Sequence, residues 1–208
     1  MVFKNRFDAG EQLAEKLGQY RNSLMLAIPR GGVEVALPIA KKTVSKVDVL
    51  VVRKISTMQD PEVAIGAITT DGTSVYNEAY ISYLGLKKEE LKIIESEARN
   101  EALRREKAYA TEKHPVTGKI VIVTDDGLAT GYTMLAAIKS IKKQKPRQVI
   151  VAVPVAAANA LELIRKECEV VCLHVSTSTA FSVASFYEEF EQLSDDRVIA
   201  LLKRANEG

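Results

Sequence analysis

Residues 119–134 read KIVIVTDDGLATGYTM and join three local patterns. The apolar, β-branched run that ends at Thr124 predicts a buried strand, and the apolar spacing after Tyr132 predicts a helix. Between them stand two adjacent aspartates, Asp125 and Asp126, followed by small and hydroxylated residues. Like charges this close disfavour each other. Either the pair merely ends the strand and caps the helix, or a ligand uses both carboxylates.

The composition is that of an ordinary globular protein. Of 208 residues, 47% are hydrophobic and 27% are charged, which suits one soluble domain. The formal net charge of +2 is too small to favour nucleic acid or an anionic membrane as a partner. No apolar run approaches the ~18 residues of a membrane span. The first ten residues contain no apolar signal region, so we expect a cytoplasmic protein.

Strand-like and helix-like segments alternate along the chain. Strands are expected over residues 23–29, 47–55, 119–124, 147–155 and 168–175, with two short strands at 66–76 around the Asp71-Gly72 turn. Helices are expected over 8–20 with Asp8 as N-cap, 31–43, 87–111, 133–144, 156–167 and from about 194.

This alternation predicts an α/β fold. Near-continuous apolar strands predict a Rossmann-like parallel sheet with helices on both faces. Such sheets bind ligands at the carboxyl ends of their strands. We expect a single domain over residues 1–208, with a core at about 20–175. Residues 1–10 and 176–193 would form a small irregular part, called the hood below.

The turn after the aspartates is not a nucleoside triphosphate loop. A P-loop reads G-x-x-x-x-G-K-[ST]. Gly127 and Gly131 are one residue too close together, and Tyr132 stands in the place of the lysine. The dinucleotide fingerprint G-x-G-x-x-G is also absent.

The same turn suits a monophosphate. Backbone N–H groups at a helix N-terminus bind phosphate, and the hydroxyls of Thr130 and Thr133 add donors. Carboxylates accept hydrogen bonds from neighbouring hydroxyls. A carboxylate pair beside a phosphate nest is therefore typical of a site for a ribose 5-phosphate.

The complete pattern, an apolar strand followed by D-D-x-x-x-T-G-x-T and a helix, resembles the ribose-phosphate motif of the type I phosphoribosyltransferases. These enzymes use 5-phosphoribosyl 1-diphosphate (PRPP). The resemblance implies that Asp125 and Asp126 hold the 2- and 3-hydroxyls. It also implies that the following loop wraps the 5-phosphate, through Gly127, Leu128, Ala129, Thr130, Gly131 and Thr133.

A second stretch is PRGG, at the end of the first expected sheet strand. Two glycines let backbone amides approach an anion, and Arg30 adds charge and a fork of donors; a plain strand–helix turn with a solvated arginine is the alternative. In the family, the loop here binds pyrophosphate, so the resemblance assigns that role to Arg30, Gly31 and Gly32. It also makes the Pro29–Arg30 peptide a candidate for a cis bond.

A third stretch, VVRKISTMQDPEVAIGAI, ends a strand with Arg53 and Lys54 and continues into a loop-like segment at 56–61. In the family, a mobile loop in this place closes over PRPP. Arg30, Arg53 and Lys54 would then stabilise the leaving pyrophosphate. The alternative is that both basic residues of the third stretch face solvent.

Together these stretches resemble a group of phosphoribosyltransferase-like proteins of bacteria and archaea. The resemblance implies transfer of 5-phosphoribosyl from PRPP to a nitrogen acceptor, with a nucleobase as first candidate, as in nucleotide salvage. Mg²⁺ is the implied cofactor, held mainly by PRPP and water and only indirectly by Asp125 and Asp126. A homodimer is also implied. The acceptor would stack on hood aromatics, for which Phe181, Phe186 and Tyr187 are candidates, although core packing explains these three as well.

Rival functions remain open at this point. A PRPP- or nucleotide-binding regulator would keep the ribose-phosphate site with little or no transferase activity. A phosphatase-like hydrolase would need D-x-D spacing, whereas adjacent aspartates point to opposite sides of an extended strand. Cys168 and Cys172 form too small a set for a zinc site.

Overall fold

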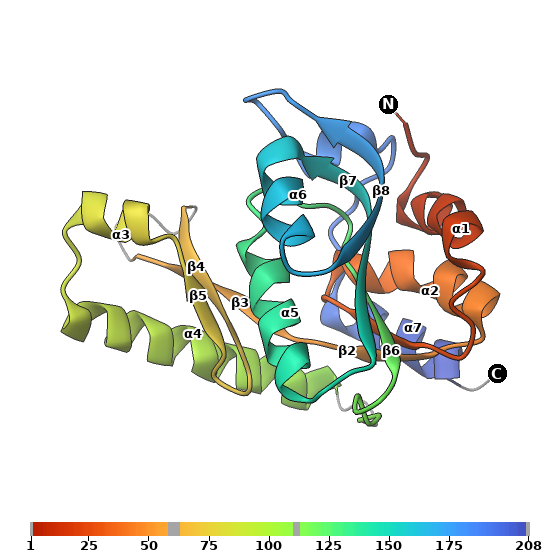
Figure 1. Ribbon diagram of the computed structural model, residues 1–208, viewed down its shortest axis with the longest axis horizontal. Helices are drawn as coiled ribbons and strands as arrows, with labels where there is room; N and C mark the ends of the chain where they lie inside the picture. Colours follow the sequence, from red (N-terminus) through yellow and green to blue (C-terminus); the bar gives the residue numbers. More distant parts are fainter. Residues whose placement is uncertain (1, 58–62, 110–112, 207–208) are drawn as a thin grey trace.

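The computed structural model describes residues 2–57, 63–109 and 113–206. Its centre is a five-stranded parallel sheet in the order β2-β1-β6-β7-β8 (Figure 1). The sheet strands are β1 (Leu24–Ala27), β2 (Lys46–Val49), β6 (Ile120–Thr124), β7 (Gln148–Ala157) and β8 (Glu169–Ser176). The predicted α/β fold is thereby confirmed.

Helices cover both faces of this sheet (Figure 1). Met25 and Ala27 of β1 pack on one face with three helices, and Leu24 and Leu26 pack on the other with two. The first set is α1 (Arg6–Leu17), α2 (Gly31–Thr43) and α7 (Asp195–Asn206); the second is α5 (Tyr132–Lys143) and α6 (Ala158–Arg165). No helix in the described part of the chain has both the length and the apolar character needed to cross a membrane.

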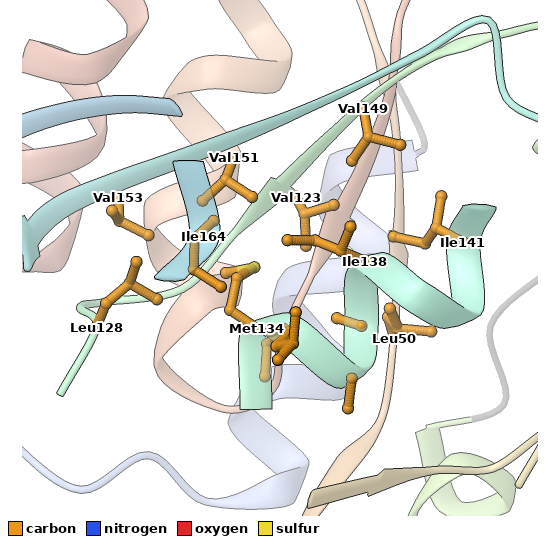
Figure 2. Close-up of a cluster of buried hydrophobic side chains, with 14 of the residues drawn as sticks. Leu50, Val123, Leu128, Met134, Ile138, Ile141, Val149, Val151, Val153 and Ile164 are labelled. Atoms are coloured by element: carbon orange, nitrogen blue, oxygen red, sulfur yellow. The ribbon is translucent and has the colours of Figure 1, made fainter. Parts of the chain in front are cut away.

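Helix α5 is held in place by its apolar face. Figure 2 shows Met134 and Ile138 of α5 directed at Val123 and Val151 of the sheet, with Leu128 in the same cluster. All five side chains are nearly inaccessible to solvent. This packing leaves the N-terminus of α5 beside the carboxyl ends of β6 and β7, where the predicted site lies.

A second, antiparallel sheet projects from the core on one side (Figure 1). It has the order β3-β4-β5, with β3 (Val52–Ser56), β4 (Ala64–Thr69) and β5 (Ser74–Tyr76). Helix α4 (Lys88–Tyr109) packs along it, after the short α3 (Glu78–Leu84). The hairpin predicted around Asp71-Gly72 is present, with Gly72 at φ +85°.

The expectation of one strand over 47–55 is wrong. The chain pairs in parallel with β1 up to Val49, and the N–H of Leu50 makes a last bond to the carbonyl of Ala27. From Val52 it pairs antiparallel with β4. A continuous apolar run therefore serves two sheets, and apolar character alone does not show where the partner strand changes. Helix α3, between its N-cap Asn77 and Gly85, was not expected either.

The two segments of the hood meet each other. Phe3 forms a parallel bridge with Tyr187, and the N–H groups of Glu188 and Glu189 bond to carbonyls of residues 3 and 4. The predicted N-cap Asp8 is wrong, because α1 begins at Arg6 and Asn5 caps it by accepting from the N–H of Asp8. The turn η1 (Val183–Phe186) precedes the bridge.

Candidate functional site

The carboxyl ends of β1 and β6 bring two of the predicted stretches together. Ala27 and Thr124 are register partners, and the N–H of Ile28 donates to the carbonyl of Thr124 at 2.9 Å. The PRGG turn thus lies directly beside the aspartate pair. The Pro29–Arg30 peptide is cis, as predicted.

The two glycines of this turn are required by close packing. A Cβ on Gly31 would lie 2.5 Å from Cγ of Asp126 and 2.9 Å from Nε of Arg6. A Cβ on Gly32 would lie 2.7 Å from the carbonyl oxygen of Thr124. These distances are too short for a side chain, so only glycine lets the turn approach the aspartates.

Asp126 forms an ion pair that the sequence did not predict. Nε of Arg6 donates to Oδ2 of Asp126 at 2.8 Å, and the two side chains are 8% and 18% exposed. Arg6 also donates to the carbonyl of Glu191 at 2.9 Å and stacks on the ring of Phe190. Residue 6 lies in a predicted hood segment, but nothing in its sequence context indicates a partner so far along the chain.

Asp125 is in a different electrostatic position. Burial raises the pKa of its carboxyl well above the usual range, and the charge of Asp126 raises it further. The backbone N–H of Asp126 donates to Oδ1 of Asp125 at 2.8 Å and acts in the opposite direction, as do the charges of Arg6 and Lys54. The two adjacent carboxyls therefore differ in their surroundings and in their hydrogen-bond partners.

The loop that follows the aspartates, residues 127–133, has one part anchored on the sheet and one part open to solvent. Leu128 is buried and bonded to β7 through both its N–H, to Val155 at 2.9 Å, and its carbonyl, from Ala157 at 2.8 Å. Leu128 is thus an anchor of the loop, and its N–H is already used. Gly127 is wedged against Val155 and Val183, where a Cβ would lie 2.8 Å from each.

The open part of the turn is suited to an anion. Ala129 and Thr130 are exposed, and Gly131 has φ +83° as the N-cap of α5, without a side-chain capping bond. Thr133 lies in the first turn of this twelve-residue helix and is partly buried. Backbone N–H groups at such an uncapped N-terminus can bind a phosphate.

The three predicted cations lie in different surroundings. Arg30 is 29% exposed and lies 3.9 Å from Asp195 at the start of α7, a long ion pair. Arg53 and Lys54 are neighbours on β3, so their side chains point to opposite faces of the strand. The charge of Lys54 acts to lower the pKa of Asp125, so Lys54 is within electrostatic range of the aspartate pair. Of the predicted loop at 56–61, residues 58–61 lie outside the described part of the chain.

The three aromatic residues predicted for the acceptor are divided between core and surface. Tyr187 is 4% exposed, packs between Phe3 and Phe190, and donates its hydroxyl to the carbonyl of Asp126 at 2.7 Å. Tyr187 is therefore a core residue, which was the alternative to acceptor stacking that the sequence also allowed. Phe181 and Phe186 are partly exposed and contact each other at 5.6 Å between ring centroids.

A cavity of about 1000 Å³ lies between α1, α2 and α7. Its lining includes Arg6, Leu37 and Pro38, and Arg197 and Leu201 from α7. Neither aspartate lines it. Arg6 thus borders this cavity and binds Asp126 as well.

Direct metal ligands are few. Among the described residues, no three His, Cys, Asp or Glu side chains gather as a metal site. Asp125 and Asp126 offer two carboxylates, one of them paired with Arg6. This set fits Mg²⁺ that is held mainly by phosphate oxygens and water. Burial raises the pKa of the Cys168 and Cys172 thiols to about 11, so they stay protonated and are poor ligands.

Comparison with known proteins finds one family over most of the chain. The family model described as phosphoribosyl transferase domain matches residues 3–190. Two Mycobacterium tuberculosis proteins, from strains CDC 1551 and H37Rv, are named as candidate phosphoribosyl transferases and are each 37% identical over 210 residues. The match covers 99% of this chain and 47% of each relative, so the chain spans about half their length.

A solved structure is also similar over nearly the complete chain. The crystal structure of TT1426 from Thermus thermophilus superposes with a TM-score of 0.82 at 34% identity. The alignment covers 98% of this chain and 99% of that one. The sequence pattern, the site geometry and the fold therefore all agree with the same protein family.

Proposed function

The chain belongs to the phosphoribosyl transferase domain family, and on that premise we propose that it transfers the 5-phosphoribosyl group of PRPP to a nitrogen acceptor with release of pyrophosphate. A nucleobase is the first candidate for the acceptor. The observation that carries the proposal is the meeting of three groups at one sheet edge: the aspartate pair, the uncapped N-terminus of α5 and the PRGG turn.

Each group has a part of PRPP to bind. Asp125 and Asp126 would accept hydrogen bonds from the ribose hydroxyls. The open segment from Ala129 to Thr133 would bind the 5-phosphate through backbone N–H groups and hydroxyls. The turn at Arg30 would face the pyrophosphate, because it packs against the aspartates.

The chemistry needs orientation more than a nucleophilic side chain. The bond from C1 to the pyrophosphate oxygen breaks, a bond from the acceptor nitrogen to C1 forms, and the nitrogen releases its proton to solvent. Holding both reactants in line removes much of the entropic barrier. Arg30 and Lys54 would stabilise the charge that develops on pyrophosphate. When bound, Mg²⁺ would neutralise part of the same charge, with Asp125 and Asp126 in contact with it through PRPP and water.

Calorimetric titration of PRPP with Mg²⁺ tests the site. We expect wild-type protein to bind and the Asp125→Asn/Asp126→Asn variant to lose binding while remaining folded. A panel of nucleobases with detection of released pyrophosphate then tests the transfer. No binding by folded wild-type protein would contradict the assignment of the ribose site.

A PRPP- or nucleotide-binding regulator is the second candidate, and the Arg6–Asp126 pair favours it. A ribose hydroxyl that competes with Arg6 for Asp126 would disturb the contact between the hood and the strand end. Ligand binding would then be coupled to the position of the hood. Tight PRPP binding without pyrophosphate release for any base would support this second function.

A further inference from the structure

The cavity between α1, α2 and α7 is lined by neither aspartate of the proposed PRPP site. Its volume of about 1000 Å³ is at the upper end for a small-molecule pocket. Helices α2 and α7 are in contact on the same face of the sheet (Figure 1), and they line the cavity with Leu37, Pro38 and Leu201. The middle of the cavity is therefore apolar and suits a ring system.

One end of the cavity is basic. Lys41 lies in the last turn of α2 and Arg204 in the last turn of α7. Lys46 begins β2, and its Nζ donates to the carbonyl of Asn206 at 3.3 Å, which brings the two helix ends together. All three cations line the cavity, and none of them forms an ion pair with a residue that the structure describes. This end can bind a phosphate group.

The other end of the cavity is acidic. Glu34 lies in the first turn of α2, and Glu189 and Glu191 come from the hood segment and its C-terminal border. Arg6 and Arg197 also line this end, but the charge of Arg6 is already compensated by an aspartate. Three carboxylates therefore outweigh one remaining cation. Such an end accepts hydrogen bonds from amino groups.

We propose that this cavity binds a nucleoside monophosphate whose base carries an amino group, such as AMP, at a site separate from that for PRPP. The phosphate binds the three cations, the base lies on the apolar middle, and its amino group donates to the carboxylates. From residue 34 to residue 41 the helix rises by ~10 Å, about the length of an extended nucleoside monophosphate.

The order of charges along the cavity excludes simpler anions. The apolar end of a fatty acid would desolvate the carboxylates without giving them a hydrogen bond, which is unfavourable. The second charge of a dicarboxylate would lie beside carboxylates of the same sign and be repelled. A ligand with an anion at one end and N–H donors at the other satisfies both ends.

The cavity is connected to the aspartate pair through Arg6. The guanidinium donates through Nη1 to the carbonyl of Glu191, which lines the cavity, and through Nε to Asp126. A nucleotide bound to the Glu191 carboxylate would hold this segment, and with it Arg6, against Asp126. This step rests on the proposed function: a ribose hydroxyl of PRPP would then compete with a more firmly held Arg6, so PRPP affinity would fall.

Calorimetric titration of AMP tests the site. AMP contains a ribose 5-phosphate, so the titration uses Asp125→Asn/Asp126→Asn, in which the proposed ribose site is disabled. We expect one molecule of AMP to bind, and Arg204→Glu in this background to weaken binding about tenfold. Lys203→Glu is the matched control, because Lys203 is an exposed cation on the same helix and does not line the cavity. The same two substitutions in the wild-type background serve as the test if the aspartate variant does not fold.

Two further ligands test the two ends of the cavity. Adenosine lacks the phosphate, and purine riboside 5′-monophosphate lacks the amino group, so each should bind about tenfold more weakly than AMP. Absence of AMP binding, equal effects of Arg204→Glu and Lys203→Glu, or equal affinities for AMP and adenosine would overturn the proposal. AMP binding to the aspartate variant when wild-type protein does not bind PRPP would support this site and contradict the proposed function.

Titration of PRPP with and without AMP tests the connection through Arg6. AMP can compete directly at the ribose site in any variant, and Arg204→Glu isolates this effect because its cavity no longer binds AMP. We expect saturating AMP to lower PRPP affinity about fivefold more in wild-type protein than in Arg204→Glu. An equal loss in both proteins would overturn the connection.

Discussion

Nε of Arg6 lies 2.8 Å from Oδ2 of Asp126, across 120 positions of the chain. The same guanidinium donates to the carbonyl of Glu191 and lies 3.8 Å from the centroid of the Phe190 ring. Arg6 is 7% exposed. One side chain therefore ties both hood segments to the aspartate pair.

This contact explains how two adjacent aspartates are tolerated at a strand end. Asp126 is compensated by a cation, and Asp125 is in surroundings that favour its protonated form. The repulsion expected for a like-charged pair is thereby reduced.

Arg6→Met should destabilise the protein by about 3 kcal/mol, because it leaves Asp126 partly buried without its cation. Arg6→Lys keeps the charge but not the two hydrogen bonds and the stacking, so its loss should be intermediate. Urea unfolding measures both. PRPP affinity should fall in the same order, since Asp126 loses its fixed position.

Lys16→Met is the matched control. Lys16 is an exposed cation on the same helix, and its replacement should change stability by no more than about 0.5 kcal/mol. Equal unfolding midpoints for Arg6→Met and Lys16→Met would show that the ion pair has no structural role.

Asp125→Asn should stabilise the free protein near neutral pH, at the same time as it abolishes PRPP binding. The pKa of Asp125 is raised in the folded state, so folding holds the proton more tightly than the unfolded chain does. Wild-type stability relative to the variant is therefore highest below the ordinary pKa of the carboxyl and falls as pH rises towards the raised value. Thermal unfolding of both proteins from acidic to neutral pH gives this difference; a constant difference would contradict the raised pKa.

Gly31→Ala should cost more than about 2 kcal/mol, because its methyl group would overlap the carboxylate of Asp126 and press on Arg6. Gly18→Ala is the control. Its Cβ would meet only the end of the Lys42 side chain at an ordinary 3.6 Å, and Gly18 has helical φ and ψ. Chemical denaturation gives the unfolding free energy of both variants, and so compares a crowded Cβ position at residue 31 with an uncrowded one at residue 18. Similar stability would argue against close packing of the PRGG turn.

The sheet could be predicted from the sequence because parallel strands buried on both faces are apolar throughout. The local motif around Asp125 could be predicted because strand, carboxylates, turn and helix are contiguous in the chain. In contrast, the change of sheet between Val49 and Val52 depends on which strand is adjacent in space, and an apolar run carries no such information.

The ion pair between Arg6 and Asp126 could not be predicted for a related reason. Arg6 stands in the N-terminal hood segment, before the helix that the sequence predicts from Asp8. Its partners lie more than 100 positions away, and they come together only when the hood packs on the strand end. Leu128 was assigned to the phosphate loop with its neighbours, but the structure uses its N–H and carbonyl to anchor that loop on β7.

The two basic residues of β3 should differ in their effect on PRPP binding. Lys54 is near enough to lower the pKa of Asp125, whereas Arg53 points to the other face of the strand. Lys54→Met should therefore weaken PRPP binding about tenfold, as expected for loss of one partly screened charge contact with phosphate, and Arg53→Met should weaken it less. Lys54 is exposed, so its replacement should leave the unfolding temperature unchanged. Calorimetry with PRPP and Mg²⁺ measures both variants, and a larger loss for Arg53→Met would show that the other face of β3 meets the ligand.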